Sequence, residues 1–312
     1  MSPTIVIVGS VNMDLMLRCP HLPRPGETVS GHDFRTLPGG KGANQAVAAA
    51  RLGASVSLIG CVGGDSFGEQ AMSALRGEGI DLRHLYVAQG VATGVAMVLV
   101  DDSGENSIAL ASGANAALSI EQIDAASAVI AGAALLVCQL ETPLASIQRA
   151  IAIAHAAGVP VLLNPAPAQS LPDGLLRQIT WLVPNEGEAA LLSGCILTKP
   201  AGAQDAMQTL VRRGAASVIV TLGAQGVAWG DANGSRHQAA KPARVQDTTG
   251  AGDAFVGALA AELALGRPLN HAIEFAQCVA AYSVEHIGAQ AAMPRRADLD
   301  RLAIQTETGS RA

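Results

Sequence analysis

Near its start the chain reads Thr4-Ile5-Val6-Ile7-Val8-Gly9, a short and uninterrupted apolar run that ends in glycine. Such a run is typical of a strand that is buried on both faces of a parallel sheet. Later runs have the same character, and helical patterns alternate with them along the chain. This alternation predicts an α/β fold with a doubly wound, mostly parallel central sheet flanked by helices. The further expected strands are 57–61, 135–138, 159–163, 181–183 and 217–221.

Three helices are expected between these strands. One is expected over residues 44–52 and another over 65–75, each as a run of helical period. A third should begin with Thr142 as its N-cap and Pro143 at the first helical position, and it should stop at Gly158.

Two segments break this alternation. Residues 15–38 carry several Pro and Gly without a helical period, and residues 92–111 read as a hairpin with its turn at 101–104. Two strand-like inserts in an α/β chain predict a small β-sheet that can cover a ligand site as a lid. A second hairpin is expected around Asp231 to Gly234. We therefore expect a main domain of residues 1–14, 39–91 and 112–312, which binds the ligands, and a lid of residues 15–38 and 92–111.

The composition excludes several classes of protein. Of the 312 residues 49% are hydrophobic, which allows a sizeable core, and only 3% are aromatic. The net charge of -6 and the lack of a Lys/Arg cluster argue against a nucleic-acid surface. The five cysteines are scattered without a CxxC pair, so we interpret them as reduced core residues of a cytoplasmic protein. The longest apolar run, residues 125–138, is too short for a membrane span, and no membrane partner is expected.

The strongest chemical signal is the stretch Asp247-Thr248-Thr249-Gly250-Ala251-Gly252-Asp253, which an apolar helical run follows. Glycines let the backbone approach a ligand closely, and the helix points free N–H groups and the positive end of its dipole at the loop. The stretch therefore predicts an anion site. A carboxylate is useful there if a hydroxyl must lose its proton beside a phosphate, so Asp253 is a candidate general base. The alternative is a tight turn in which Asp253 is only a helix N-cap.

A second signal is the stretch Pro38-Gly39-Gly40-Lys41-Gly42-Ala43-Asn44, which precedes a helix of small residues. It is not a P-loop, because Lys41 is followed by Gly rather than by Ser or Thr. No GxGxxG follows the first strand, so a dinucleotide-dependent oxidoreductase is not supported. We interpret the stretch as a place where the backbone and Asn44 hold a substrate, and a flexible connection is the alternative.

Polar residues also follow other expected strands, at the edge where open α/β sheets bind their ligands. Asn12 and Asp14 follow the first strand and suit pairs of sugar hydroxyls, with plain turn residues as the alternative. Asn185 and Glu188 would share one face of a helical turn and could orient a phosphate and the waters of Mg²⁺. The alternative for this pair is a helix N-cap with a first-turn Glu. Two further strand ends carry Thr221-Leu222-Gly223-Ala224-Gln225-Gly226 and Glu141.

At these residues the chain resembles the ribokinase family of carbohydrate kinases, the PfkB superfamily. It matches two signatures of that family, residues 39–44 and 247–253, and the resemblance runs from Val8 to Gln290. Two positions depart from the pattern, since Gly250 stands where the family often has Ala and Gln277 where a relative carries His. The stretches 25–28, 113–115 and 164–167 are similar to those members of the family that act on D-ribose.

The resemblance implies that Asp253 deprotonates O5 of D-ribose and that ATP supplies the phosphoryl group, giving ribose 5-phosphate and ADP. The N–H groups of Gly250, Ala251 and Gly252 would form the anion hole for the γ-phosphoryl group. Sugar hydroxyls would be held by Asn12, Asp14, Gly40, Lys41, Gly42, Asn44, Glu141 and Asp253.

The resemblance also implies cofactors and a partner. Glu188 would bind Mg²⁺ through water, and a monovalent cation, usually K⁺, would activate the enzyme beside the anion hole. Members of the family form homodimers through their lids, which implies the same here. ATP would contact Asn185, Thr221, Leu222, Gly223, Ala224, Gln225, Gly226, Gly252 and Gln277. The monovalent cation would be bound by Asp247, Thr249, Ser283, His286, Gly288 and Ala292.

Other functions stay open at this point. The acceptor could be another small sugar, such as fructose or 2-deoxyribose, or a nucleoside. A different class is a non-catalytic sensor of sugars or nucleotides on the same fold. The intact Asp253 and its glycines favour an enzyme over a sensor.

Overall fold

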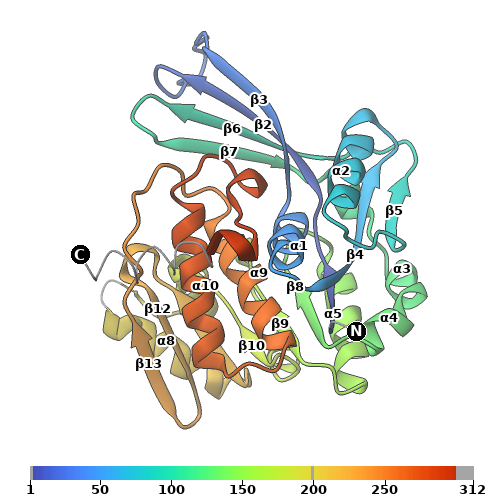
Figure 1. The fold of residues 1–312 in the computed structure, drawn as a ribbon, viewed down its shortest axis with the longest axis vertical. Helices are drawn as coiled ribbons and strands as arrows, with labels where there is room; N and C mark the ends of the chain where they lie inside the picture. Colours follow the sequence, from blue (N-terminus) through green and yellow to red (C-terminus); the bar gives the residue numbers. More distant parts are fainter. Residues whose placement is uncertain (1–2, 198–199, 300–312) are drawn as a thin grey trace.

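The computed structural model describes residues 3–197 and 200–299, which form two sheets and the helices around them (Figure 1). Among these residues the larger sheet has nine strands in the order β13-β12-β11-β10-β9-β8-β1-β4-β5. Every pair from β11 to β5 is parallel, whereas β12 and β13 run antiparallel at one edge. The expected doubly wound, mostly parallel sheet is therefore confirmed. Its strands are β1 Thr4–Val8, β4 Ser55–Gly63, β5 Leu85–Ala88, β8 Leu135–Cys138, β9 Val161–Leu163, β10 Trp181–Leu182, β11 Ser217–Thr221, β12 Val227–Asp231 and β13 Gly234–Gln238.

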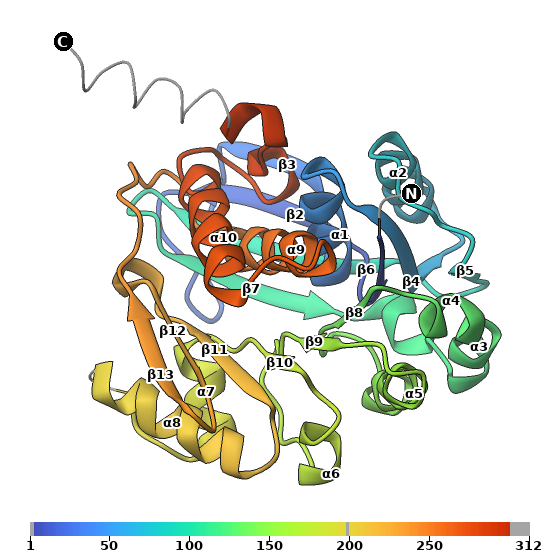
Figure 2. The ribbon, with the colours of Figure 1, turned by 60° about the horizontal axis from the view of Figure 1, so that its bottom comes forward.

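Successive residues of β1 point to opposite faces of this sheet. Ile5 and Ile7 pack on one face and Val6 and Val8 on the other, and all four side chains are fully buried. Helices α1, α2, α9 and α10 cover the first face, and α3 to α8 cover the second (Figure 2). A strand between two helical layers needs an apolar residue at every position, which explains the uninterrupted run. The helices are α1 Lys41–Arg51, α2 Ser66–Gly77, α3 Ile120–Ala125, α4 Ser127–Ala131, α5 Leu144–Ala156, α6 Asp173–Leu176, α7 Glu186–Ser193, α8 Pro200–Arg212, α9 Ala251–Ala264 and α10 Leu269–Ser283.

The two inserts form the second sheet, which projects beyond the larger one (Figure 1). It consists of β3 Asp33–Gly39, β2 Asn12–Cys19, β6 Gly94–Asp101 and β7 Asn106–Ala111, in this order. The antiparallel pairing of β6 with β7 confirms the expected hairpin. Strand β2 begins at Asn12 and β3 ends at Gly39, so this sheet reaches further toward the main domain than the boundaries at residues 15 and 38. Asn12 and Asp14 therefore belong to β2.

The start of α5 differs from the expectation. The helix begins at Leu144, and Pro143 occupies the N-cap position without a side-chain cap. The reason is the extended backbone of Pro143, whose ψ of 128° places it outside the helix. Thr142 is therefore not the cap, and no group among the described residues bonds its buried Oγ1.

The other expected elements are present. Helix α1 begins at Lys41, and α2 has Asp65 as an N-cap that accepts a hydrogen bond from the backbone N of Gly68. The second expected hairpin is confirmed, because Asp231 pairs with Gly234 at the turn between β12 and β13. Within the described part of the chain, no helix combines the length and the apolar character that a membrane crossing requires.

Candidate active site

The polar residues expected at strand ends gather at one edge of the larger sheet. Strands β1, β8, β9, β10 and β11 are parallel neighbours, so their carboxyl ends lie side by side. Backbone contacts join the segments that follow them, such as the bridge between Asn185 and Thr221. The polar segments at this edge are residues 10–14 after β1, 139–141 after β8, Asn164 after β9, Asn185 after β10 and 222–226 after β11.

The loop of residues 39–42 lies against the end of β1 so closely that its glycines have no room for a side chain. Gly40 has a φ of 91°, and a Cβ on it would lie 2.7 Å from the backbone N of Asn12. A Cβ on Gly42 would lie 2.6 Å from the carbonyl carbon of Gly9. The loop is therefore packed in place, and the alternative of a flexible connection is wrong.

Glu141 fastens this loop to the end of β8. Its Oε2 accepts a hydrogen bond from Oγ of Ser10 at 2.5 Å and one from the backbone N of Lys41 at 3.3 Å. Three segments far apart in the sequence thus meet at one carboxylate, and two of these residues were expected in the site. The sequence carries no signal for Ser10, because a lone Ser after a strand looks like any turn residue.

Asn12 is buried where β2 begins. Its Oδ1 accepts a hydrogen bond from Nδ2 of Asn115 at 2.7 Å, and Oδ1 of Asn115 accepts one from the backbone N of Val11 at 2.8 Å. Because Oδ1 of Asn12 is used in this way, its Nδ2 is the group that can donate to a ligand.

Asp253 lies in the first turn of α9 and is 7% exposed. Its Oδ2 accepts a hydrogen bond from Nδ2 of Asn44 at 2.9 Å, and its Oδ1 accepts one from Nε2 of Gln45, also at 2.9 Å. The N-cap of α9 is Gly250, and no side chain caps the helix. The interpretation of Asp253 as a mere N-cap is therefore wrong, because its carboxylate binds side chains of α1 instead of the backbone of α9.

Four amide residues around this carboxylate were not expected from the sequence. In a single sequence, Gln within a helix of small residues, or Gln and Asn after a strand, are not distinguished from ordinary polar positions. Their role becomes visible only through contacts across 94 to 246 positions of sequence. They are Gln45, Gln139, Asn164 and Gln290.

Gly250, Ala251 and Gly252 form the N-terminus of α9. Gly250 has a φ of 75°, and a Cβ on it would lie 2.9 Å from the Cβ of Ala289, so conformation and space both favour glycine here. A Cβ on Gly252 would have no neighbour within 4 Å. The N–H of Ala251 donates to the carbonyl oxygen of Thr248 at 3.2 Å.

One lysine lies among several carboxylates at this site. Burial, and then the charges of Glu141 and Asp253, raise the pKa of Asp14 to about 7. The carboxylate of Asp253 is the main cause that raises the pKa of Lys41 above its ordinary value, so Lys41 stays protonated. Burial raises the pKa of Glu188, and the backbone hydrogen bond of Asn185 partly offsets this effect. The site carries an excess of negative charge, so a phosphate needs a cation there.

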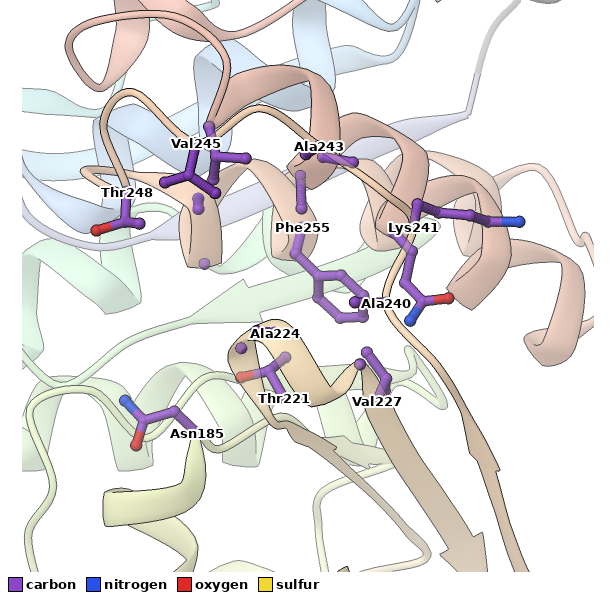
Figure 3. Close-up of a pocket in the computed structure, with 18 of the residues that line it drawn as sticks. Asn185, Thr221, Ala224, Val227, Ala240, Lys241, Ala243, Val245, Thr248 and Phe255 are labelled. Atoms are coloured by element: carbon purple, nitrogen blue, oxygen red, sulfur yellow. The ribbon is translucent and has the colours of Figure 1, made fainter.

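A cavity of about 830 Å³ lies beside this cluster, between α7, the end of β11, and helices α9 and α10 (Figure 3). Seven of the residues expected at ATP contribute to its wall, whereas Leu222 and Gln225 do not. Leu222 points into the core, where it is 3% exposed. The seven are Asn185, Thr221, Gly223, Ala224, Gly226, Gly252 and Gln277.

The loop before residue 247 forms another part of this wall and was not expected from the sequence. Ala240, Lys241, Ala243 and Val245 line the cavity from this loop, and the ring of Phe255 lies nearby on α9 (Figure 3). The loop has no glycine-rich motif and no period, so the sequence carries no signal for it. Its mostly apolar wall suits the flat face of an aromatic base.

Asn185 and Glu188 form a capping box at the start of α7. Oδ1 of Asn185 accepts from the backbone N of Glu188 at 2.9 Å, and Oε2 of Glu188 accepts from the backbone N of Asn185 at 2.8 Å. The alternative interpretation of this pair, a helix N-cap with a first-turn Glu, is thus confirmed as its geometry. Nδ2 of Asn185 also donates to Oε1 of Glu188 at 3.0 Å.

Asp247 ties the loop before α9 to the C-terminal segment. Its Oδ1 accepts from the backbone N and Oγ1 of Thr249 at 2.9 and 2.6 Å, and its Oδ2 accepts from the backbone N of Gly288 at 2.8 Å. Burial alone would raise the pKa of Asp247, but these hydrogen bonds lower it below its ordinary value. The carboxylate therefore stays ionised next to the first turn of α9.

The other residues expected at a monovalent cation lie on this same C-terminal segment. Ser283 and Ala292 are buried, and His286 stacks on Tyr282 with its ring centroid at 4.4 Å. No cluster of three or more His, Cys, Asp and Glu suited to a metal ion occurs within residues 3–197 and 200–299.

Comparisons with known proteins agree with one another. A family model described as pfkB family carbohydrate kinase matches residues 2–296. A ribokinase of Haemophilus influenzae is 43% identical over 95% of this chain and 97% of its own length. A deoxyribokinase of Salmonella typhi is 35% identical over 93% and 95%, respectively. The structure of Arabidopsis thaliana ribokinase complexed with ribose and ATP is similar with a TM-score of 0.88 at 33% identity, over 97% of this chain and 99% of the other.

Proposed function

This chain belongs to the pfkB family of carbohydrate kinases and is an ATP-dependent sugar kinase, and we propose that it phosphorylates D-ribose at O5. The observation that carries this proposal is Asp253, a buried carboxylate held at both oxygens by amide side chains beside the N-terminus of α9. A general base needs such a fixed position next to the hydroxyl that it deprotonates. The ribose in the Arabidopsis complex supports the choice of acceptor.

In the reaction, Asp253 takes the proton of the O5 hydroxyl while a lone pair of O5 attacks the γ-phosphorus. The bond from that phosphorus to the bridging oxygen breaks, and its electron pair leaves with ADP. The products are ribose 5-phosphate, ADP and the proton left on Asp253. The protein contributes mainly by positioning the two substrates and by stabilising charge, since phosphoryl transfer requires little other covalent chemistry from it.

The sugar lies between the glycine loop before α1 and the start of β2. Its hydroxyls exchange hydrogen bonds with groups that already contact one another, such as the carboxylate of Glu141 and the backbone N–H of Lys41. These contacts fix the site before the sugar binds, which lowers the entropy lost on binding. The proposed sugar ligands are Asn12, Asp14, Gly40, Lys41, Gly42, Asn44 and Glu141.

The N–H groups of Gly250, Ala251 and Gly252 stabilise the charge that develops on the γ-phosphoryl group. They are the first N–H groups of α9, where the helix dipole adds to the effect. The N–H of Ala251 must exchange its 3.2 Å bond to Thr248 for one to the phosphoryl oxygen. Gly252 adds no side chain at the cavity wall, which leaves room for the phosphate.

ATP occupies the cavity of about 830 Å³, with Asn185, Thr221, Gly223 and Gln277 at its wall. Mg²⁺ fits this site as the counter-ion of the phosphates, because the carboxylates around Lys41 carry excess negative charge. Both oxygens of Glu188 accept hydrogen bonds from Asn185, so Glu188 would support the ion through water. When bound, Mg²⁺ supplies charge neutralisation for the phosphates.

A monovalent cation, K⁺ in the usual case, fits the loop between Asp247 and the C-terminal segment. The ionised carboxylate of Asp247 and the sharp turn at Gly288, with a φ of 95°, support this position. The carbonyl groups of this loop are the type of ligand that such an ion takes. The proposed residues are Asp247, Thr249, Ser283, His286, Gly288 and Ala292.

We also propose that two copies associate through the second sheet. Large apolar side chains on three of its strands are exposed in the single chain, which is typical of an interface. They are Phe34 on β3, Met97 on β6, and Ile108 and Leu110 on β7.

An acceptor panel tests the proposed function. ADP release should be fastest with D-ribose when ribose, 2-deoxyribose, fructose and nucleosides are compared at equal concentration, with and without K⁺. No turnover of ribose, with turnover of another acceptor, would remove the ribose proposal and keep the sugar kinase.

A second acceptor, 2-deoxyribose, has a specific observation in its favour. The deoxyribokinase of Salmonella typhi is 35% identical to this chain over nearly its whole length. The two acceptors differ by one hydroxyl, and a site built to bond that hydroxyl rejects the analogue that lacks it. The ratio of kcat/KM for ribose and 2-deoxyribose therefore separates the two.

A further inference from the structure

A chain of buried amide side chains runs beneath the proposed base. Nε2 of Gln139, at the end of β8, donates to Oε1 of Gln45 at 2.6 Å. Nε2 of Gln45 in turn donates to Oδ1 of Asn164 at 3.1 Å and to Oδ1 of Asp253 at 2.9 Å. Gln45 and Gln139 are both fully buried, so neither reaches a ligand in the cleft.

The contacts of Gln45 allow its amide only one orientation. Nδ2 of Asn164 donates to the carbonyl oxygen of Val183 at 2.9 Å, so Asn164 turns its oxygen toward Gln45. Gln139 turns its nitrogen toward Gln45. Gln45 must therefore point its oxygen at Gln139 and its two N–H groups at Asn164 and Asp253, which uses every hydrogen-bonding group of its side-chain NH₂. A flipped amide would place its single oxygen against Oδ1 of Asn164 and Oδ1 of Asp253, which are both acceptors.

This orientation carries a cost at Gln139. Its Oε1 is buried, and no group among the described residues bonds it. An unpaired buried acceptor costs free energy, and such groups call for an explanation. The backbone makes room for this amide, because a Cβ on Gly9 would lie 2.0 Å from that same oxygen. Gln139 therefore acts as a donor to Gln45 although its oxygen has no partner within residues 3–197 and 200–299.

We propose that Gln45 is a positioning residue for phosphoryl transfer. Its amide, oriented by Gln139 and Asn164, holds Oδ1 of Asp253 and thereby turns Oδ2 toward the acceptor hydroxyl. Oδ2 is the oxygen on the sugar side, since its partner Asn44 is a proposed sugar ligand. This inference rests on the proposed function, in which Asp253 is the base.

The first test is Gln45→Met, which keeps the length of the side chain and removes its hydrogen bonds. We expect kcat to fall about 10- to 100-fold while KM for ribose stays within about threefold, because Gln45 does not touch the sugar. The matched control is Gln122→Met, which removes the capping box of α3 at a distance from the site. That variant should lose thermal stability and keep the kcat of the wild type.

The second test keeps Gln45 and changes only what orients it. Gln139→Glu replaces the donor by an acceptor, so Gln45 should turn its nitrogen toward residue 139 and its oxygen toward Asp253. Gln139→Met removes one bond and leaves the other two partners of Gln45 in place. We expect kcat to fall at least tenfold in the first variant and only a few-fold in the second, with sugar binding kept in both.

The outcomes separate this inference from the proposed function. If the wild type turns over ribose and folded Gln45→Met has a kcat within twofold of it, the inference is overturned and the proposed function stands. If Gln45→Met does not fold, the order of the two Gln139 variants decides, and equal kcat values overturn the inference. If the wild type phosphorylates no acceptor, the proposed function fails and the inference fails with it.

Discussion

The first turns of α9 and α7 place a carboxylate at the same position, three residues after the N-cap, but surround it differently. In α7 the N-cap is Asn185, and its side chain and backbone bind Glu188 in a capping box. In α9 the N-cap is Gly250, which has no side chain, and Asp253 binds Asn44 and Gln45 of α1 instead. Glu188 thus caps its own helix, whereas Asp253 binds side chains of a second helix.

The difference shows how a glycine cap changes the use of a helix N-terminus. A side-chain cap satisfies the free N–H groups and occupies the carboxylate at the third position. Gly250, with its φ of 75°, provides no side chain to cap these N–H groups, and Asp253 is placed by tertiary contacts instead. The same local pattern thus yields a carboxylate bound within its own helix turn at α7 and one bound by a second helix at α9.

The largest effect should come from comparing the two carboxylates directly. Asp253→Asn removes the proposed base, so kcat should fall by at least about 10²-fold while ribose binding is largely kept. Glu188→Gln keeps an acceptor for Asn185, so kcat should fall only about tenfold, through weaker support of Mg²⁺. Steady-state kinetics together with ribose binding by calorimetry would measure both.

Near-normal turnover by folded Asp253→Asn would remove Asp253 as the base. A loss in Glu188→Gln as large as that in Asp253→Asn would show that the two carboxylates do not divide the work as proposed. Circular dichroism of both variants serves as the control for folding.

A second, smaller effect separates the two glycines of the α9 turn. Gly250→Ala places a side chain in the left-handed region and against Ala289, so the free energy of unfolding should fall by about 1–2 kcal/mol. Gly252→Ala meets no neighbour within 4 Å, so stability should be kept, while its methyl group enters the cavity and raises KM for ATP. Urea unfolding and ATP titration measure the two effects. Equal stability losses would contradict this division.

The smallest effect concerns Asp14, a carboxylate placed by a strand instead of a helix. Its pKa of about 7 in the folded protein exceeds the ordinary value of 3.8, so the folded state binds this proton more tightly. Its contribution to stability is complete below the ordinary pKa and is lost as the pH rises through about 7. From pH 5 to pH 8 the wild type should lose on the order of 1 kcal/mol relative to Asp14→Asn, since the side chain is half-buried and screened.

Unfolding of both proteins in urea at pH 5, 6.5 and 8 would measure this difference. A stability gap between wild type and Asp14→Asn that stays constant with pH would show that Asp14 ionises normally in the folded protein.

The first turn of α9 shows how far local sequence could predict this site. The glycines and Asp253 were visible as an anion site with a carboxylate, because helix dipoles and glycine conformations are local properties. What the carboxylate binds was not visible, since its partners Asn44 and Gln45 lie more than 200 positions away. The N-cap alternative therefore stayed open in the sequence and was removed only by the fold.

The start of α5 shows the opposite case, because the local signals predicted a position for the helix start that differs from the one in the structure. Thr142 and Pro143 match the usual pattern of a cap and a first helical residue, yet the extended backbone of Pro143 moves the start to Leu144. Part of the cavity wall, such as Asn185 and the glycines after β11, could be predicted from the sequence. The loop of residues 240–245 lines the cavity because the chain passes along the cavity after β13. No local pattern in the sequence predicts this path.

The alternation of strands and helices and the glycine-rich turn before Asp253 could both be predicted from the sequence. These follow from neighbouring residues, through apolar periodicity and through backbone conformations that only glycine adopts with ease. Which carboxylate caps its own helix and which binds a second helix follows only from the packed fold. That choice depends on hydrogen bonds between segments that only the packed sheet brings together, such as Gln45 of α1 with Asp253 of α9.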